Sequence, residues 1–200
     1  MSRIDRIEGT AIPLRGRDID TDRIIPARFL RSVTFEGLEN HIFEDDRRAL
    51  EAQGAVHAFS NPAYRGASIL LVNGNFGSGS SREHAPQGLE RWGIRAIVGE
   101  SFSEIFFGNA AALGVPCFAA DPVEIAALQD LAEREPRSRF AASVKDLTIV
   151  APGRTLRASM PRAVQEALVT GIWDGTGLLL EDYDEVEAVA KRLPYITDFS

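Results

Sequence analysis

An apolar run, a glycine- and serine-rich turn and a helical pattern follow one another directly near the middle of the chain. The apolar run covers residues 69–72, the turn covers residues 75–85, and the helical pattern ends at Gly93. Short, continuous apolar runs are typical of buried strands, and a glycine after a helical pattern is a common stop signal. The sequence therefore predicts a strand-to-helix junction at the turn, which limits the chain to folds that contain this connection.

Strand and helix patterns alternate along the rest of the chain. Strands are expected near residues 7–14, 68–72, 96–98, 116–119, 147–150 and 156–158. Helices are expected near residues 35–51, 82–92, 102–113, 122–134, 161–170 and 183–193. Alternation of this kind is typical of α/β proteins. Residues 53–67 are rich in loop formers and are expected to form a mobile surface loop.

The length and composition of the chain favour one domain and argue against nucleic-acid binding and membrane binding as the main function. The chain has 200 residues, 44% of them hydrophobic, which suffices for one sizeable core, so a single domain over residues 1–200 is expected. A net charge of −7 argues against nucleic acid or an anionic membrane as the main partner. The sequence contains neither a long apolar run nor the apolar core of a signal peptide, so a cytoplasmic location is expected.

The single cysteine, Cys117, limits the redox and metal chemistry of this chain. It excludes an internal disulfide, and it excludes any iron–sulfur or structural zinc site that needs three or four thiolates from this chain alone. Cys117 lies in an apolar segment, where a free cysteine packs as a small hydrophobic residue. We therefore expect no metal on this chain.

The turn has the properties of an anion-binding site. The first N–H groups of a helix are unpaired and carry partial positive charge, which favours a carboxylate or phosphate. Arg82 adds a planar guanidinium that can bind a carboxylate through two hydrogen bonds. Gly77 and Gly79 have no Cβ and would let the backbone approach a ligand closely.

Two interpretations of the serines in the turn stay open from the residues alone. Ser80 or Ser81 could act as a base or nucleophile if N–H groups and Arg82 stabilise its alkoxide. Alternatively, Ser80 and Glu83 fit the capping box S-x-x-E, which would stabilise only the start of the helix. The turn has no G-x-S-x-G motif and no dinucleotide-binding glycine pattern, so a hydrolase triad is a weaker explanation.

A second polar cluster consists of alternating aspartates and includes Asp20 and Asp22. It lacks the glycine and the distal glutamate of a calcium loop, so support of a neighbouring site is the expected role. Aspartate side chains commonly bond nearby backbone in turns. His84 is expected to support the site through a hydrogen bond rather than as a metal ligand, and Glu83 is expected to hold His84 or Arg82.

Three motifs occur in a fixed order along the chain. They are Asp20-Thr21-Asp22-x-Ile24-Ile25-Pro26, Asn75-Phe76-Gly77-x-Gly79-Ser80-Ser81-Arg82-Glu83-His84-Ala85 and Ser101-Phe102-x-x-Ile105-Phe106-x-x-Asn109. Together they resemble the small subunits of 3-isopropylmalate dehydratase, the isopropylmalate isomerase of the aconitase superfamily. The resemblance is best over residues 5–120, whereas residues 173–200 depart from the commonest bacterial form.

The resemblance implies a fold, an activity and a partner. The fold would be a swivelling β/β/α domain that closes over a large subunit, and the large subunit would carry a [4Fe–4S] cluster on its own cysteines. The assembled hydro-lyase would interconvert 2-isopropylmalate and 3-isopropylmalate by dehydration and rehydration in leucine biosynthesis. The cluster iron would act as a Lewis acid on the substrate hydroxyl, so this chain alone is expected to be inactive.

The resemblance also implies roles for individual residues. Ser80 would be the base that removes a proton from carbon, and Ser81 and Arg82 would bind a substrate carboxylate. Arg31, in the loop that the family uses for substrate choice, could face a distal carboxylate or point to solvent with its stem over Phe29.

Three alternatives to this function stay open. Related dehydratases act on methylmalate, dimethylmalate or homocitrate-type acids. The turn could instead belong to a non-catalytic carboxylate-binding module, or to a structural subunit with a well-capped helix.

Overall fold

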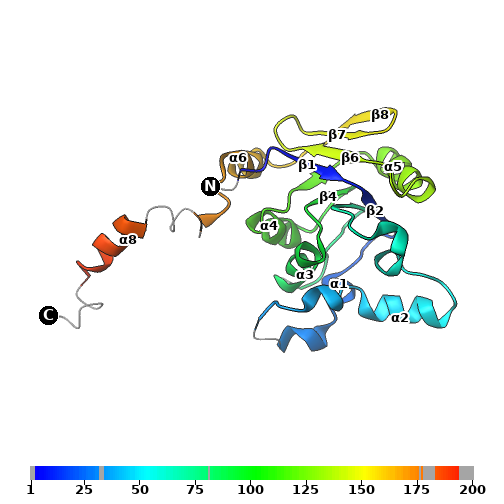
Figure 1. Ribbon diagram of the computed structural model, residues 1–200, viewed down its shortest axis with the longest axis horizontal. Helices are drawn as coiled ribbons and strands as arrows, with labels where there is room; N and C mark the ends of the chain where they lie inside the picture. The colour runs from blue at the N-terminus through cyan, green and yellow to red at the C-terminus, as the bar shows by residue number, and fades with distance from the viewer. Residues whose placement is uncertain (1–2, 32–33, 81, 176, 178–182, 194–200) are drawn as a thin grey trace.

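The computed structural model describes residues 3–31, 34–80, 82–175, 177 and 183–193, and its described strands form two four-stranded sheets (Figure 1). The parallel sheet has the order β2 (Ala11–Leu14), β3 (Ile69–Val72), β4 (Ala96–Gly99), β5 (Cys117–Ala119). The antiparallel sheet has the order β1 (Arg6–Gly9), β6 (Phe140–Ser143), β7 (Thr148–Ala151), β8 (Arg154–Arg157).

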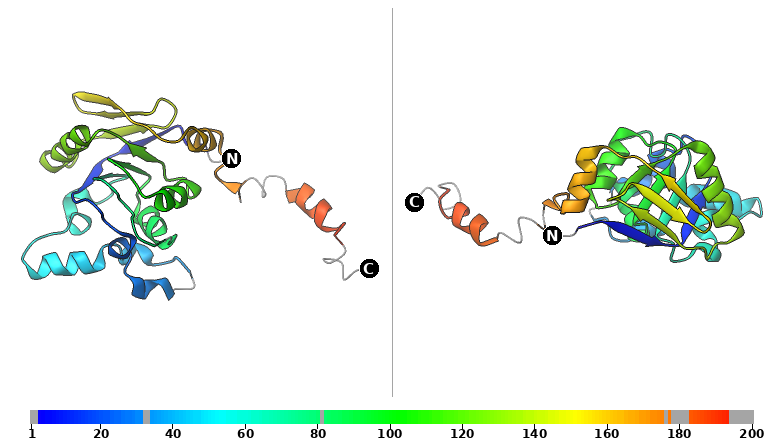
Figure 2. Two further views of the ribbon diagram at one scale, coloured as in Figure 1. Left: turned by 180° about the vertical axis from the view of Figure 1, so that it is seen from behind. Right: turned by 90° about the horizontal axis from the view of Figure 1, so that it is seen from above.

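The described helices are α1 (Thr21–Ile24), α2 (Glu44–Ala52), α3 (His84–Trp92), α4 (Glu104–Ala112), α5 (Pro122–Arg134), α6 (Arg162–Thr170) and α8 (Tyr183–Ala190). The strand–helix alternation confirms the α/β prediction. None of these helices combines the length and hydrophobicity that a membrane span requires. Helix α8 lies apart from the sheets in both views of Figure 2 and contains no buried residue.

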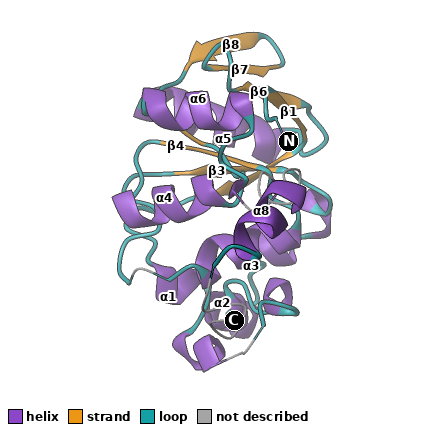
Figure 3. Cartoon of the chain, turned by 90° about the vertical axis from the view of Figure 1, so that its left-hand side faces the viewer, coloured by secondary structure: helices purple, strands orange, loops and turns teal. Residues whose placement is uncertain are grey.

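The parallel sheet is buried on both faces, which explains why its strands are continuous apolar runs. In β3, Leu70 and Val72 point into one core together with side chains of α3 and α4. Ile69 and Leu71 point into a second core, which α5, α6 and the antiparallel sheet complete. Figure 3 shows these layers, with α4 on one side of β3 and β4, and α6, β7 and β8 on the other.

The strand expected over residues 7–14 is two strands in two different sheets. β1 pairs with β6 and β2 pairs with β3, so the chain crosses between the sheets at Thr10. The crossing brings backbone segments close together, because a Cβ on Gly9 would lie 1.9 Å from Ser68 Oγ. Glu8, Gly9 and Thr10 interrupt the apolar residues here, but they do not reveal which strand each half pairs with.

The helix expected over residues 35–51 is shorter than predicted. Positive φ angles at Gly37 (85°) and Phe43 (51°) interrupt it, so a 3₁₀ turn (Leu38–Asn40) precedes α2. Helix α1 and strand β6 were not predicted from the sequence. The β6 sequence, Phe-Ala-Ala-Ser, is poor in β-branched residues, and its place in the sheet depends on distant partners.

Residues 53–67 were expected to be a mobile surface loop, and most of them are exposed, although four side chains of the segment are buried. Two 3₁₀ turns (Ala58–Ser60 and Pro62–Tyr64) form within the segment. His57 and Asn61 cap these turns with their side chains. Phe59 and Tyr64 are buried and pack in the core beside β3.

Candidate active site

The carboxyl ends of β2, β3 and β4 meet at one edge of the parallel sheet. The loops that leave these strands contain the three motifs identified in the sequence. Ligands of open α/β sheets bind outside the carboxyl ends of parallel strands, in the crevice between such loops. The three motifs therefore converge at the position where this type of sheet places a functional site.

The glycine- and serine-rich loop lies between its two neighbours and continues the pattern of the sheet beyond the strands. On one side, the Phe76 N–H donates to the Ser101 carbonyl (3.1 Å). On the other side, the Gly77 N–H donates to the Ile19 carbonyl (2.8 Å), and the Thr21 N–H donates to the Ser78 carbonyl (2.8 Å). Backbone hydrogen bonds therefore fix this loop before any side chain contributes.

Gly77 and Gly79 are required by the folded structure of the loop, independently of any ligand. Gly77 has φ 75°, and a Cβ at this position would lie 2.2 Å from Phe106 Cγ in α4. Gly79 has φ 98°, and its Cβ would lie 3.3 Å from Thr21 Oγ1. Close approach to neighbouring side chains and a left-handed backbone together explain both residues.

Ser80 is exposed at the end of this loop. Its carbonyl accepts from the Arg82 N–H (2.8 Å) and from Thr21 Oγ1 (3.3 Å), whereas its hydroxyl has no hydrogen-bond partner among the described residues. The capping-box prediction is wrong. Helix α3 begins at His84 with Glu83 at the N-cap, and no side chain caps the helix. Ser81 lies outside the described residues.

Arg82 forms an ion pair with Asp22 of α1. The Arg82 side chain is 23% exposed and that of Asp22 is 50% exposed, so the pair lies at the surface of the site. Asp20 caps α1, because its Oδ1 accepts from the Arg23 N–H (2.8 Å). Asp22 therefore holds the arginine that follows the glycine- and serine-rich loop, whereas the Asp20 side chain stabilises the start of α1.

His84 and Glu83 begin α3 but do not contact each other as expected. His84 packs edge-to-face against Phe35, with ring centroids 5.0 Å apart. The Glu83 carboxylate accepts from Gln87 Nε2 (3.1 Å), so its partner is neither His84 nor Arg82. The first intrahelical bond runs from the Gln87 N–H to the Glu83 carbonyl, so the N–H groups before Gln87 have no partner within the helix.

Arg31 ends a 3₁₀ turn (Ala27–Arg31), is exposed, and has no ion-pair partner among the described residues. Two other side chains contact the Phe29 ring. The Arg28 guanidinium lies 4.7 Å from the Phe29 ring centroid, and the His41 ring stacks on Phe29 at 3.8 Å.

Arg28 also fastens the same turn to α2. It binds Asp45 through two hydrogen bonds (2.7 and 2.8 Å), which lower the pKa of that carboxyl. This contact leaves Arg31 as the cation of the turn that remains available to a ligand.

Two polar residues at this edge of the sheet were not predicted from the sequence. Asn73 follows β3 directly, Glu100 follows β4 directly, and Asn73 Nδ2 donates to Glu100 Oε1 (2.8 Å). A polar residue immediately after an apolar strand was the available signal, because both positions lie at the functional edge of a parallel sheet.

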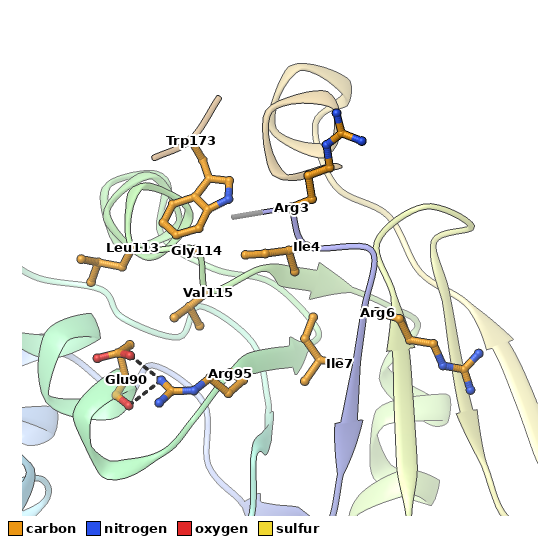
Figure 4. A pocket seen from close by; sticks show the side chains of 10 residues that line it. All are labelled: Arg3, Ile4, Arg6, Ile7, Glu90, Arg95, Leu113, Gly114, Val115 and Trp173. Atoms are coloured by element: carbon orange, nitrogen blue, oxygen red, sulfur yellow. Dashed lines mark hydrogen bonds and ion pairs between the residues drawn. The ribbon is translucent and has the colours of Figure 1, made fainter. Parts of the chain in front are cut away.

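A cavity of about 400 Å³ lies elsewhere, between the start of the chain, the end of α4 and Trp173 (Figure 4). Ile4, Ile7 and Val115 form part of its apolar wall, and an ion pair between Glu90 and Arg95 lies at one end. None of the site residues predicted from the sequence and described by the structure lines it.

Cys117 is buried in β5, as expected, and burial raises the pKa of its thiol. A protonated thiol within a strand is unsuited to metal ligation. Among the described residues, no group of three or more histidine, cysteine or acidic side chains is arranged to hold a metal ion.

The chain is similar in sequence to known proteins. Residues 1–117 match the model of the aconitase C-terminal domain. The chain is 46% identical to the 3-isopropylmalate dehydratase small subunit of Synechocystis over 98% of this chain and 96% of the relative. It is 47% identical to a protein of the same name from Thermus thermophilus, over 94% of each. The similarity thus extends well beyond residues 5–120.

A solved structure shows the same fold. The crystal structure of 3-isopropylmalate dehydratase from Methanocaldococcus jannaschii superposes with a TM-score of 0.64 and 22% sequence identity. The alignment covers 90% of this chain and 99% of that protein, which confirms the β/β/α fold expected from the motifs. By sequence similarity over nearly its whole length, the chain belongs to the family of 3-isopropylmalate dehydratase small subunits, which are built on the aconitase C-terminal domain.

Proposed function

We propose that this chain is the small subunit of a heteromeric hydro-lyase that interconverts 2-isopropylmalate and 3-isopropylmalate in leucine biosynthesis, in the cytoplasm. The names of its relatives support the activity. The observation that carries the proposal for this chain is the exposed Ser80, whose hydroxyl is unbonded among the described residues, in the same loop as Arg82.

In the proposed reaction, Ser80 Oγ removes the proton from the carbon next to a substrate carboxylate, and the hydroxyl group on the neighbouring carbon leaves, which forms the alkene acid. During rehydration the proton and the hydroxyl group add back to the two carbons in the exchanged positions. A serine is a weak base unless its alkoxide is stabilised. The positive end of α3 and the Arg82 guanidinium supply positive charge at this edge of the sheet. Arg82, with Ser81, binds the carboxylate, and Asp22 holds the guanidinium in one orientation.

The active site is completed by a large subunit. We place the [4Fe–4S] cluster of this enzyme class on that subunit, because one buried cysteine is an unsuitable donor set for such a cluster. The chain would then supply the base and the carboxylate-binding residues, and it would be inactive alone.

Arg31 is proposed to contribute to substrate choice. Its exposure on a turn held by Arg28 and Phe29 supports this role. A cation here suits an acid with an additional distal carboxylate, so homocitrate-type acids are the alternative substrates that Arg31 would favour. Methylmalate and dimethylmalate, which have two carboxylates like isopropylmalate, are compared as alternatives that differ only in the alkyl group.

The test is reconstitution with the large subunit encoded in the same genome, prepared without oxygen. Formation of the alkene acid is followed by ultraviolet absorbance for this chain, the large subunit and their mixture. Turnover only in the mixture, fastest with isopropylmalate, is expected. Turnover by this chain alone, or a silent mixture with an intact cluster, would contradict the proposal.

A further inference from the structure

A buried polar network lies directly behind the glycine- and serine-rich loop. Its centre is Gln129 of α5, which is fully buried and donates from Nε2 to the carbonyls of Leu14 and Leu71 (both 3.3 Å). A buried amide is retained only when its polar atoms are paired. Gln129 therefore joins the ends of β2 and β3 to the helix that covers them.

Asn73 extends the network to the start of the loop. It exchanges hydrogen bonds with the Gln129 amide (3.3 and 3.4 Å), and its Oδ1 accepts from the Gly16 N–H (3.0 Å). Its Nδ2 also donates to Glu100 Oε1 (2.8 Å). One side chain thus connects three strand ends at the position where the loop begins.

Glu100 is the charged member of the network, and its side chain is only 8% exposed. Removing a carboxylate from water is unfavourable unless partners compensate it. Here Asn73 binds one oxygen and the Arg17 guanidinium pairs with the other. This pair covers Gly74, where a Cβ would lie 2.3 Å from Arg17 Nη2 and 3.1 Å from Glu100 Oε2.

The residue after Glu100 continues the contact with the loop. Ser101 Oγ accepts from the Asn75 N–H (2.8 Å), and its carbonyl accepts from the Phe76 N–H (3.1 Å). The placement of the end of β4 therefore determines the placement of the loop that ends at Ser80.

We propose that Glu100 is a positioning residue for Ser80: by holding Asn73 and Arg17, it fixes the loop of residues 74–80 in the geometry that proton transfer requires. The inference rests on the proposed function. Small displacements of a reacting group reduce the rate far more than they reduce substrate binding. Loss of Glu100 should therefore lower kcat, while Arg82, which Asp22 holds separately, preserves KM.

The test uses three variants, each assembled with the large subunit. Glu100→Gln keeps an oxygen for Asn73 but loses the charge that pairs with Arg17, Arg17→Gln loses only that pair, and Glu100→Ala loses both contacts. Glu100→Ala is expected to lower kcat about tenfold or more with KM little changed. Glu100→Gln and Arg17→Gln should fall between this variant and the wild type.

The matched control is Glu124→Ala. Glu124 pairs with Arg154 (2.6 Å) away from the loop, and both side chains are 41% exposed. Its kcat should equal that of the wild type. Wild-type kcat in both Glu100 variants would overturn the proposal.

Hydrogen–deuterium exchange of the chain without its partner provides a readout that needs no activity. Exchange of the Phe76 and Gly77 amides should be several-fold faster in the Glu100 variants than in the wild type or in Glu124→Ala. Unchanged exchange would overturn the inference. An inactive wild-type mixture would instead refute the proposed function, and exchange would still decide the role of Glu100.

Discussion

Arg82 and Asp22 are 60 residues apart in the sequence and form an ion pair at the edge of the parallel sheet. Asp22 lies on α1 and Arg82 lies between Ser80 and α3. The contact ties the end of the glycine- and serine-rich loop to the aspartate motif. It also gives the guanidinium a defined orientation, which two-point binding of a carboxylate requires.

Replacing Asp22 should therefore weaken substrate binding. Asp22→Asn removes the charge that orients Arg82, and kcat/KM of the assembled enzyme should fall about tenfold, mainly through KM. Glu166→Gln, which breaks an exposed ion pair with Arg162 in α6, is the control and should have no effect. An unchanged KM in Asp22→Asn would show that Arg82 does not depend on this contact.

Ser80→Ala should abolish turnover while substrate still binds. Loss of a general base lowers kcat by about 10²–10⁴-fold. Substrate affinity, measured by calorimetry on the assembled enzyme, should stay close to the wild-type value because Arg82 remains. Ser138→Ala, far from the site in sequence and exposed to solvent in part, controls for loss of a hydroxyl. A Ser80 variant with normal kcat and weakened binding would favour a carboxylate-binding module.

Arg31→Ala should change the ranking of substrates more than the overall rate. Rates with isopropylmalate and with an acid that has a distal carboxylate are compared for the wild type and the variant. Removing the exposed cation should reduce kcat/KM for the more highly charged acid by about tenfold or more. Arg65→Ala is a suitable control for removal of an arginine elsewhere. The same ranking in all three proteins would exclude Arg31 from substrate choice.

Gly77→Ala should destabilise the chain more than Gly54→Ala. Both glycines have a positive φ, 75° and 73°, so each alanine costs about 1–2 kcal/mol for the left-handed backbone. Only at Gly77 would the new Cβ also overlap Phe106, which adds about 1–3 kcal/mol. Denaturant unfolding measures both changes. Equal losses would mean that α4 shifts to accommodate the methyl group.

His57 should make stability depend on pH in the acid range. Burial lowers the pKa of His57 to about 4, and its Nδ1 accepts from the Phe59 N–H (3.2 Å). The unfolded chain binds a proton below about pH 6.5, whereas the folded chain resists protonation until about pH 4. The free energy of unfolding should thus fall by about 2–3 kcal/mol as pH decreases between these values.

The matched variant for this measurement is His57→Asn. Asparagine also accepts a backbone N–H at a helix start but does not titrate. Its unfolding free energy should decrease less steeply with acid over the same range. Identical pH profiles for the two proteins would refute the role of His57.

The strands of the parallel sheet were predictable because they are buried on both faces. Their apolar runs are local, and a short window of sequence contains them completely. Part of the candidate site was also predictable, because Ser80, Arg82 and the glycines lie within a few residues of one another in the sequence. Glu83 was assigned the wrong partner, because sequence proximity does not reveal that the Gln87 amide, one helical turn along, is better placed.

The α/β alternation, the three motifs and the family could be predicted from the amino-acid sequence, because each depends on residues that are close along the chain. The crossing at Thr10, the Arg82–Asp22 pair and the contact between Asn73 and Glu100 became visible in the folded chain alone. These features depend on which strand lies beside which. That order is set by burial of both sheet faces over the whole molecule, and no local pattern contains it.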